Sequence, residues 1–120
     1  MSDALASSEP PTGDPGGKRR EQRRRVLLSG KLVHSLGELT VDCAIQDLST
    51  TGARVRVPDD TLVGDPIYLI NMSHGVAYRA RVAWRRENRL GLAFSRAFDL
   101  SQVNEDAPKV LRRLWMEHIR

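Results

Sequence analysis

The chain has 120 residues, a formal net charge of +4 at pH 7 and 40% hydrophobic residues. This length suffices for one domain that buries a core without disulfides or metal. Its single cysteine, Cys43, excludes an internal disulfide and a zinc site built from cysteines. No apolar run approaches the length of a membrane span and no signal-peptide segment opens the chain, so we expect a cytoplasmic protein.

The basic surplus is almost wholly arginine, because only Lys18, Lys31 and Lys109 of the 19 basic residues are lysines. Arginine presents a planar, always charged fork to phosphate oxygens or to the Hoogsteen edge of guanine. The composition therefore indicates an anionic partner. A genome rich in G and C would also favour arginine codons, which leaves a second explanation open.

The first 25 residues differ in composition from the rest. Residues 1–17 are rich in Pro, Gly and Ser and poor in apolar residues, so they cannot offset the entropy lost on ordering, and we predict a disordered tail. Residues 18–25 (KRREQRRR) carry six basic residues and one acidic residue. Taken alone, this density is typical of a solvated arm or of a weak nucleic-acid patch.

From Val26 onward the apolar residues alternate with a period of two, which indicates strands. We predict six strands, at residues 26–32, 38–48, 53–57, 67–72, 76–85 and 90–94. Each has one apolar face and ends in turn-forming residues, so residues 26–98 are expected to form an antiparallel sheet closed into a small barrel, a mainly all-β fold. Cys43 shares an apolar phase, which predicts an ordinary buried thiol. Trp84 continues the phase of Tyr78 and Val82, which predicts an inward indole.

The C-terminal residues 106–120 have the helical period instead. Asp106 is the expected N-cap, and Pro108 falls in the first turn. The apolar stripe comprises Val110, Leu111, Leu114, Trp115, His118 and Ile119. We expect this helix to pack on the barrel mouth or on a partner.

The sequence lacks the residue patterns that are typical of an active site. The three histidines fall in different predicted elements, and the sequence contains no HExxH, CxxC or GxSxG motif. Asp47 and Ser49 share a strand phase with no general base beside them, so the serine lacks activation. We therefore predict no enzyme, no catalytic residue, no metal ligand and no cofactor.

Binding is better supported, by two polar stretches. Asp47–Gly52 places a carboxylate, hydroxyls and a glycine between two predicted strands, where a plain turn would use the same residue types. The arginines of residues 18–25 precede it by one strand. Guanine accepts from arginine at O6 and N7 and donates to carboxylates, while phosphates bind arginine forks. A ligand that combines guanines with phosphates would satisfy both stretches.

These stretches, RxxxR followed one strand later by (D/N)xSxxG, resemble the motifs of the PilZ domain, the bacterial receptor module for cyclic di-GMP. Asp47, Ser49 and Gly52 match every position of the second motif. Residues 82–86 (VAWRR) and 90–94 (LGLAF) resemble the closing strands of that domain. The resemblance covers residues 19–98 and implies a PilZ-like barrel preceded by a ligand-binding arm at residues 18–25.

The first motif has two registers, since Arg19 with Arg23 and Arg20 with Arg24 both satisfy it. We favour Arg20 and Arg24 as the core pair, with Arg19 and Arg23 as further phosphate contacts. The resemblance further implies that Asp47 binds guanine N–H groups, Ser49 binds a nearby polar atom of the ligand, and Gly52 lets the backbone turn closely.

The implied function is a stand-alone cyclic di-GMP receptor that changes its surface on binding and regulates an effector protein in motility, polysaccharide production or surface attachment. Two alternatives remain. One is a PilZ-like module that contacts only proteins, and the weaker one is a basic barrel that binds RNA or DNA through the outward arginines. The effector, the number of ligands and the oligomeric state stay open.

Overall fold

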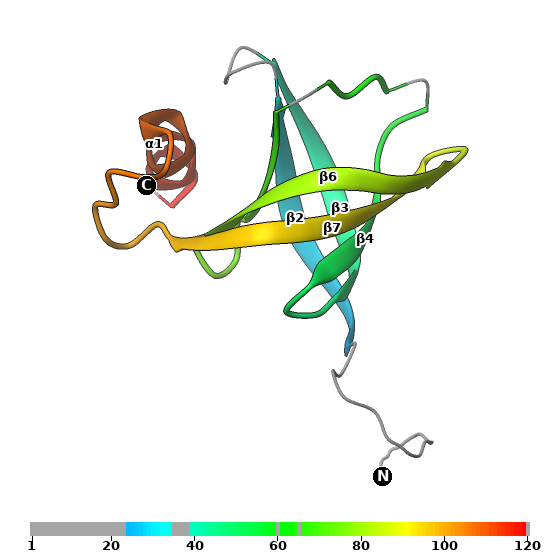
Figure 1. Ribbon diagram of the computed structural model, residues 1–120, viewed down its shortest axis with the longest axis horizontal. Helices are drawn as coiled ribbons and strands as arrows, with labels where there is room; N and C mark the ends of the chain where they lie inside the picture. Colours follow the sequence, from blue (N-terminus) through cyan, green and yellow to red (C-terminus); the bar gives the residue numbers. More distant parts are fainter. Residues whose placement is uncertain (1–23, 35–38, 60, 65, 120) are drawn as a thin grey trace, which may run out of the picture.

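The structure is a computed structural model that describes residues 24–34, 39–59, 61–64 and 66–119 (Figure 1). Its strands close into a barrel in the order β2-β3-β4-β7-β6-β5, and every neighbouring pair is antiparallel. The strands are β2 (Arg24–His34), β3 (Leu39–Leu48), β4 (Gly52–Arg56), β5 (Ile67–Asn71), β6 (Val76–Arg86) and β7 (Arg89–Asp99). The predicted six-stranded antiparallel barrel with a C-terminal helix is confirmed. The predicted tail and most of the predicted arm, residues 1–23, lie outside the described residues.

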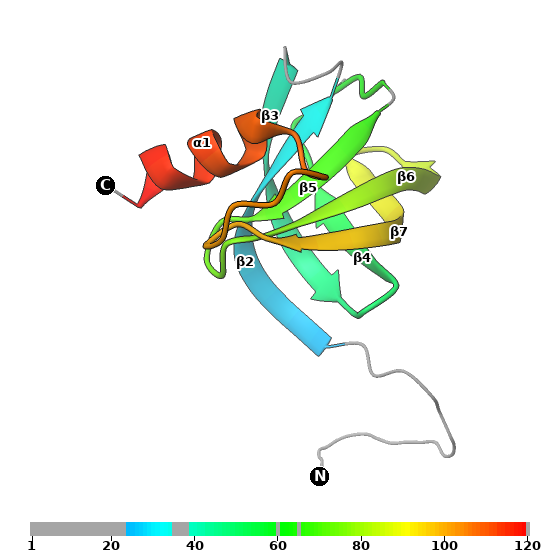
Figure 2. The ribbon, with the colours of Figure 1, turned by 60° about the vertical axis from the view of Figure 1, so that its left-hand side comes forward.

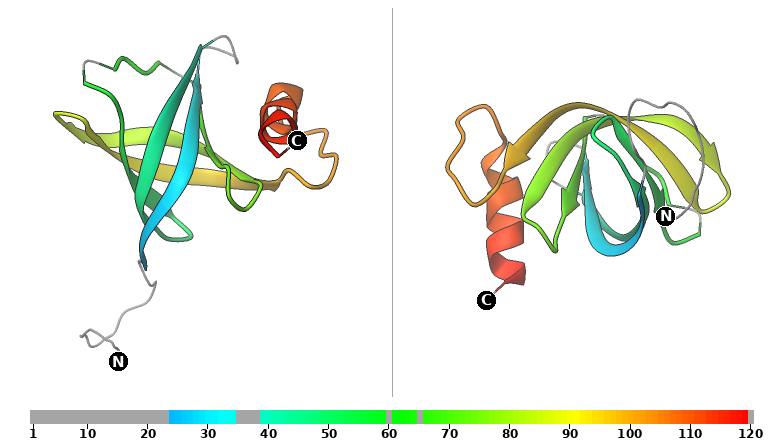
Figure 3. Two further views of the ribbon diagram at one scale, coloured as in Figure 1. Left: turned by 180° about the vertical axis from the view of Figure 1, so that it is seen from behind. Right: turned by 90° about the horizontal axis from the view of Figure 1, so that it is seen from below.

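The barrel interior is filled by apolar side chains that alternate with outward side chains along each strand. One phase of each strand fills the core, with Leu32, Ile45, Val55, Leu69 and Leu90 all fully buried. Burying a side chain of this size stabilises the fold by roughly 1.5–3 kcal/mol relative to exposure. Views from opposite sides show β2 and β3 on one wall and β6 and β7 on the other (Figures 1 and 3).

Bulges reverse the side-chain phase in two strands that matter for the site. The pairing of β6 with β7 shifts between Val82 and Trp84, so Val82 faces Leu92 in the core while Trp84 pairs with Gly91 and is 45% exposed. The predicted inward indole is therefore wrong, because an extra residue in one strand moves all following side chains to the other face. A similar shift between Ile45 and Asp47 lies in β3.

The helix α1 spans Lys109–His118 and begins later than predicted. Pro108 occupies the N-cap position with an extended ψ of 133°, and the N-cap makes no side-chain hydrogen bond. Asp106 is therefore not the N-cap, and its carboxylate accepts a hydrogen bond from Arg96 at 3.3 Å. Proline at the cap is compatible with the helix start, because the first helical turn does not use that backbone N–H.

The helix lies beside the barrel wall, away from the β6–β7 hairpin (Figures 1 and 2). Leu111 is fully buried in a second core cluster together with Ile70, Ala77 and Phe98, which are neighbours in register on β5, β6 and β7. Trp115 donates its Nε1 hydrogen to the carbonyl of Met72 at 3.1 Å. The apolar stripe of the helix thus covers the outer wall of the barrel and not its mouth.

Candidate functional site

The turn between β3 and β4 is locked by Ser49. Its backbone N–H donates to the carbonyl of Gly52 at 2.9 Å, and its Oγ accepts from the N–H groups of Gly52 at 3.2 Å and Thr51 at 3.3 Å. The side chain is only 8% exposed. A serine hydroxyl that bonds nearby backbone in this way holds the turn in one conformation. Whether Ser49 also touches a ligand stays a prediction.

Gly52 permits the close approach of two strands. It pairs with Ala93 of β7, and a β-carbon at position 52 would lie 2.4 Å from the carbonyl oxygen of Leu92. Backbone at that distance cannot move aside as a flexible side chain could. The close approach of β4 and β7 therefore requires glycine at position 52, independently of any role in binding a ligand.

Asp47 follows the bulge in β3, which points it to the outer face opposite Arg54 of β4. Its Oδ2 lies 3.9 Å from Nη2 of Arg54, a long ion pair. The Asp47 side chain is 16% exposed and that of Arg54 is 35% exposed. Nε of Arg54 is buried and makes no hydrogen bond within the described part of the chain. The Asp47 carboxylate is mostly buried and the Arg54 side chain is partly exposed, so the pair places an acceptor group beside a donor group at the outer face.

Strand pairing continues this pair into a row across the outer face. Asp47 pairs with Arg54, Arg54 pairs with Gly91 of β7, and Gly91 pairs with Trp84 of β6. We call these four residues the binding row. Because neighbouring strands lie about 4.8 Å apart, the row spans about 14 Å. The row ends in an exposed aromatic ring, which is the platform that a base can stack on.

Only some of the predicted site residues lie together in the described part of the structure. Asp47, Ser49 and Gly52 lie together at the turn. Arg24 is described through its backbone, which pairs with Leu48, so the end of the predicted arm enters beside the turn. The other predicted arginines, Arg19, Arg20 and Arg23, lie outside the described residues.

Three residues of the binding row were not predicted from the sequence. The alternation in residues 53–57 already placed Arg54 outward, and a two-stranded pairing across the turn would have put it opposite Asp47. Gly91 and Trp84 could not be found in this way, because β7 does not follow β4 in the sequence and the bulge before Trp84 leaves no mark in the alternation.

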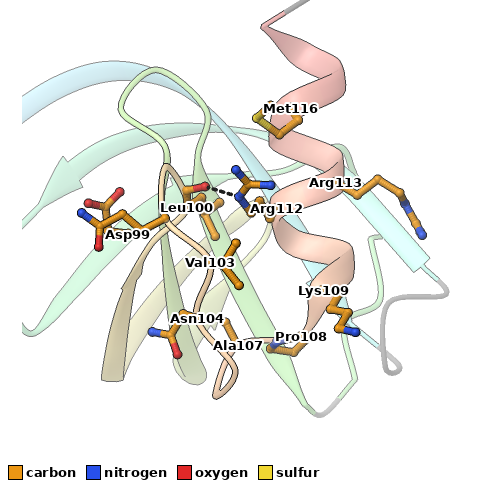
Figure 4. A pocket seen from close by; sticks show the side chains of 11 residues that line it. Asp99, Leu100, Val103, Asn104, Ala107, Pro108, Lys109, Arg112, Arg113 and Met116 are labelled. Carbon is orange, nitrogen blue, oxygen red and sulfur yellow. Dashed lines mark hydrogen bonds between the residues drawn. The ribbon is translucent and has the colours of Figure 1, made fainter.

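A separate hollow of about 450 Å³ lies between the segment after β7 and α1 (Figure 4). Leu100, Val103, Ala107 and Met116 give it an apolar lining. At its rim, Arg112 donates from Nε to the carbonyl of Leu100 at 3.1 Å. Such a lining does not suit guanines or phosphates, and the hollow lies at the opposite end of β7 from Gly91. It is a weaker candidate for a polar ligand than the binding row.

The remaining reactive groups fit structural roles. Burial raises the pKa of the Cys43 thiol to about 12, with a smaller contribution from Asp42, so the sulfur stays protonated near neutral pH. Within the described ranges, no three His, Cys, Asp or Glu side chains gather where they could hold a metal ion. The helix in the described part of the chain is too short to cross a bilayer.

The fold and the site together define a small antiparallel β-barrel with a polar turn and an outward binding face. The family model of the PilZ domain matches residues 17–107. The chain belongs to the PilZ domain family, a family of cyclic di-GMP receptors and regulatory modules. The resemblance in the motifs is thereby confirmed at the level of the family.

A comparison of structures found similarity to the crystal structure of the PilZ domain of CeSA from a cellulose synthesizing bacterium. The two chains share 15% sequence identity, with a TM-score of 0.45, and the match covers 82% of this chain and 99% of the other. A comparison with curated proteins gave no match.

Proposed function

We propose that this protein is a cyclic di-GMP receptor that acts as a regulatory adaptor, and not as an enzyme. The observation that supports the proposal is the backbone pairing of β2 with β3, in which Arg24 pairs with Leu48 and Arg25 pairs with Asp47. The start of β2, at the end of the predicted arm, therefore lies beside the turn that carries the second motif. The turn that carries Asp47, Ser49 and Gly52 is rigid, so the acceptor groups are preorganised.

Each part of the site has a chemical role in this proposal. Asp47 accepts hydrogen bonds from the N1 and N2 hydrogens of a guanine, while arginines of residues 18–25 bind the phosphates and the Hoogsteen edge. Arg54 flanks the carboxylate, and the exposed part of its guanidinium group donates to the ligand. Trp84 stacks on a base at the other end of the binding row, where each stacked base contributes about 1–3 kcal/mol.

Signal output is proposed to follow from binding of the ligand by residues 18–25. Contacts of this segment with the ligand would convert a small molecule into a new surface that a cytoplasmic effector protein can recognise. Motility, envelope polysaccharide and surface attachment are the processes that we propose for this adaptor. None of the residues described selects among the three.

The test is isothermal titration of the full chain with cyclic di-GMP, with cyclic di-AMP and GTP as controls. We expect saturable binding of cyclic di-GMP alone, which Arg24→Ala and Asp47→Ala each weaken by at least about tenfold, the loss expected for one hydrogen bond to a charged group. Circular dichroism of each variant checks the fold. Absence of heat with every dinucleotide would refute the proposal and favour a module that contacts only proteins.

Salt dependence separates this function from binding to RNA or DNA. A polyanion held by many arginines releases many counterions, so its affinity falls steeply as salt rises. A ligand with two phosphates that is also held through its bases loses much less affinity. The titration is therefore repeated at low and at physiological salt, with a single-stranded RNA as the comparison ligand.

A further inference from the structure

Three arginines lie side by side on adjacent strands next to the binding row. Arg56 of β4 pairs in register with Arg89 of β7, and Arg89 pairs with Arg86 of β6. All three are exposed. No guanidinium group of the three forms an ion pair or a hydrogen bond with another residue of the described chain. We call these three residues the arginine row.

The arginine row is unfavourable for the isolated fold. Residues directly opposite each other in an antiparallel pair have β-carbons about 4.5–5.5 Å apart, and like charges at that separation destabilise the sheet. The neighbouring Arg85 shows the contrast. It falls on the other phase, opposite Leu90, and its guanidinium donates to the carbonyls of Thr61 and Glu87. The Arg85 side chain has structural partners, whereas the three guanidinium groups of the arginine row have none among the residues that the structure describes.

The two rows share one face. Arg56 follows Arg54 by two residues on β4, Arg89 precedes Gly91 by two on β7, and Arg86 follows Trp84 by two on β6. Two residues along a strand correspond to about 7 Å. A molecule that lies on the binding row therefore has the three guanidinium groups within reach of its edge.

We propose that the arginine row binds phosphate groups. Guanidinium forks match phosphate oxygens in a bidentate geometry and keep their charge at every relevant pH, and a bound phosphate relieves the repulsion within the row. The phosphates have two sources: the ring of a dinucleotide on the binding row, or a separate phosphate-containing anion. Only the first source rests on the function proposed above.

The experiment compares two doubly substituted proteins that lose the same charge. Arg56→Gln with Arg89→Gln removes the centre of the arginine row. Arg79→Gln with Arg113→Gln removes two exposed arginines elsewhere and serves as the control. Both proteins and the wild type are titrated with cyclic di-GMP and, separately, with inorganic tripolyphosphate. Circular dichroism and urea unfolding confirm that both variants fold.

We expect the row variant to bind cyclic di-GMP at least about tenfold more weakly than the control variant, because two charged hydrogen-bond donors are lost. A selective loss for tripolyphosphate alone assigns the row to a separate phosphate anion, and this result stands even if the wild type binds no dinucleotide. Equal affinities of the row and control variants for both anions would overturn the proposal. Failure of the wild type to bind either anion would overturn it as well.

Discussion

Trp84 of β6 lies over Gly91 of β7, so closely that a β-carbon at position 91 would stand 2.0 Å from the indole Nε1. The two residues are paired in register on the outer face. Because Gly91 has no side chain, the indole ring of Trp84 can lie directly over its backbone and cover it. This contact fixes the aromatic end of the binding row.

Replacement of Gly91 by alanine should displace the indole. We expect a loss of about 1–3 kcal/mol in the free energy of unfolding, the usual cost of overpacking, and a weaker affinity for cyclic di-GMP. Urea unfolding and titration measure the two effects. Trp84→Ala serves as the comparison, because it removes the ring and keeps the glycine. If Gly91→Ala binds ligand as the wild type does, the position of the ring is not part of the site.

Gly52→Ala should damage the barrel more severely. The new β-carbon meets the backbone carbonyl of Leu92, so β4 and β7 must separate, and we expect a loss of about 3 kcal/mol or more in stability. Thermal unfolding followed by circular dichroism measures this loss. The control is Gly64→Ala, at an exposed glycine without a positive φ. Equal melting temperatures for the two variants would contradict the close approach of the strands.

Asp47 and Ser49 should respond differently to substitution. Asp47→Asn keeps the shape of the side chain and removes the charge that faces Arg54 at 3.9 Å, and we expect the loss of this long ion pair to change stability by less than about 1 kcal/mol. Affinity for cyclic di-GMP should fall at least about tenfold, because an amide oxygen is a weaker acceptor than a carboxylate. Denaturant unfolding and titration of the same protein separate the two effects.

Ser49→Ala should mainly lower the stability of the folded protein. The substitution leaves the buried N–H group of Gly52 and the part-buried N–H group of Thr51 without the Oγ acceptor, which costs about 1–3 kcal/mol. Ser49→Thr keeps the hydroxyl and should recover part of this loss. An alanine variant that is as stable as the wild type would show that the turn does not depend on the hydroxyl.

Trp115 should matter for the helix and not for the ligand. Trp115→Phe removes the hydrogen bond to Met72, so we expect a loss of about 1 kcal/mol in stability with unchanged affinity for cyclic di-GMP. The exposed Ile119 provides the control, since Ile119→Ala should change neither quantity. A clear loss of ligand affinity in Trp115→Phe would mean that α1 is coupled to the binding row.

The thiol of Cys43 should react slowly in the folded protein. Because burial raises its pKa from 9.0 to about 12, the reactive thiolate is nearly absent near neutral pH. The raised pKa contributes to the stability of the folded state, and this contribution is fully present below pH 9.0. It is lost as the pH rises toward 12. Alkylation by iodoacetamide, followed by mass spectrometry, should be far faster in urea than in buffer. Equal rates would contradict the buried environment.

The class of fold and the order of the motifs could be predicted from the sequence alone. A period of two identifies strands because it reflects a local rule, the alternation of side chains on a pleated backbone. Turn residues such as those at Asp47–Gly52 are local signals as well. Asp47, Ser49 and Gly52 could therefore be selected before any pairing of strands was known.

Which residues face one another could not be predicted in the same way. Asp47, Arg54 and Gly91 align because β3, β4 and β7 pair in register, and Trp84 faces outward because a bulge shifts β6 by one residue. Registers and bulges are set by closure of the whole barrel, which balances contacts between residues far apart in the chain. A local pattern does not contain that balance, so the binding row and the arginine row emerge only when the strands are assembled.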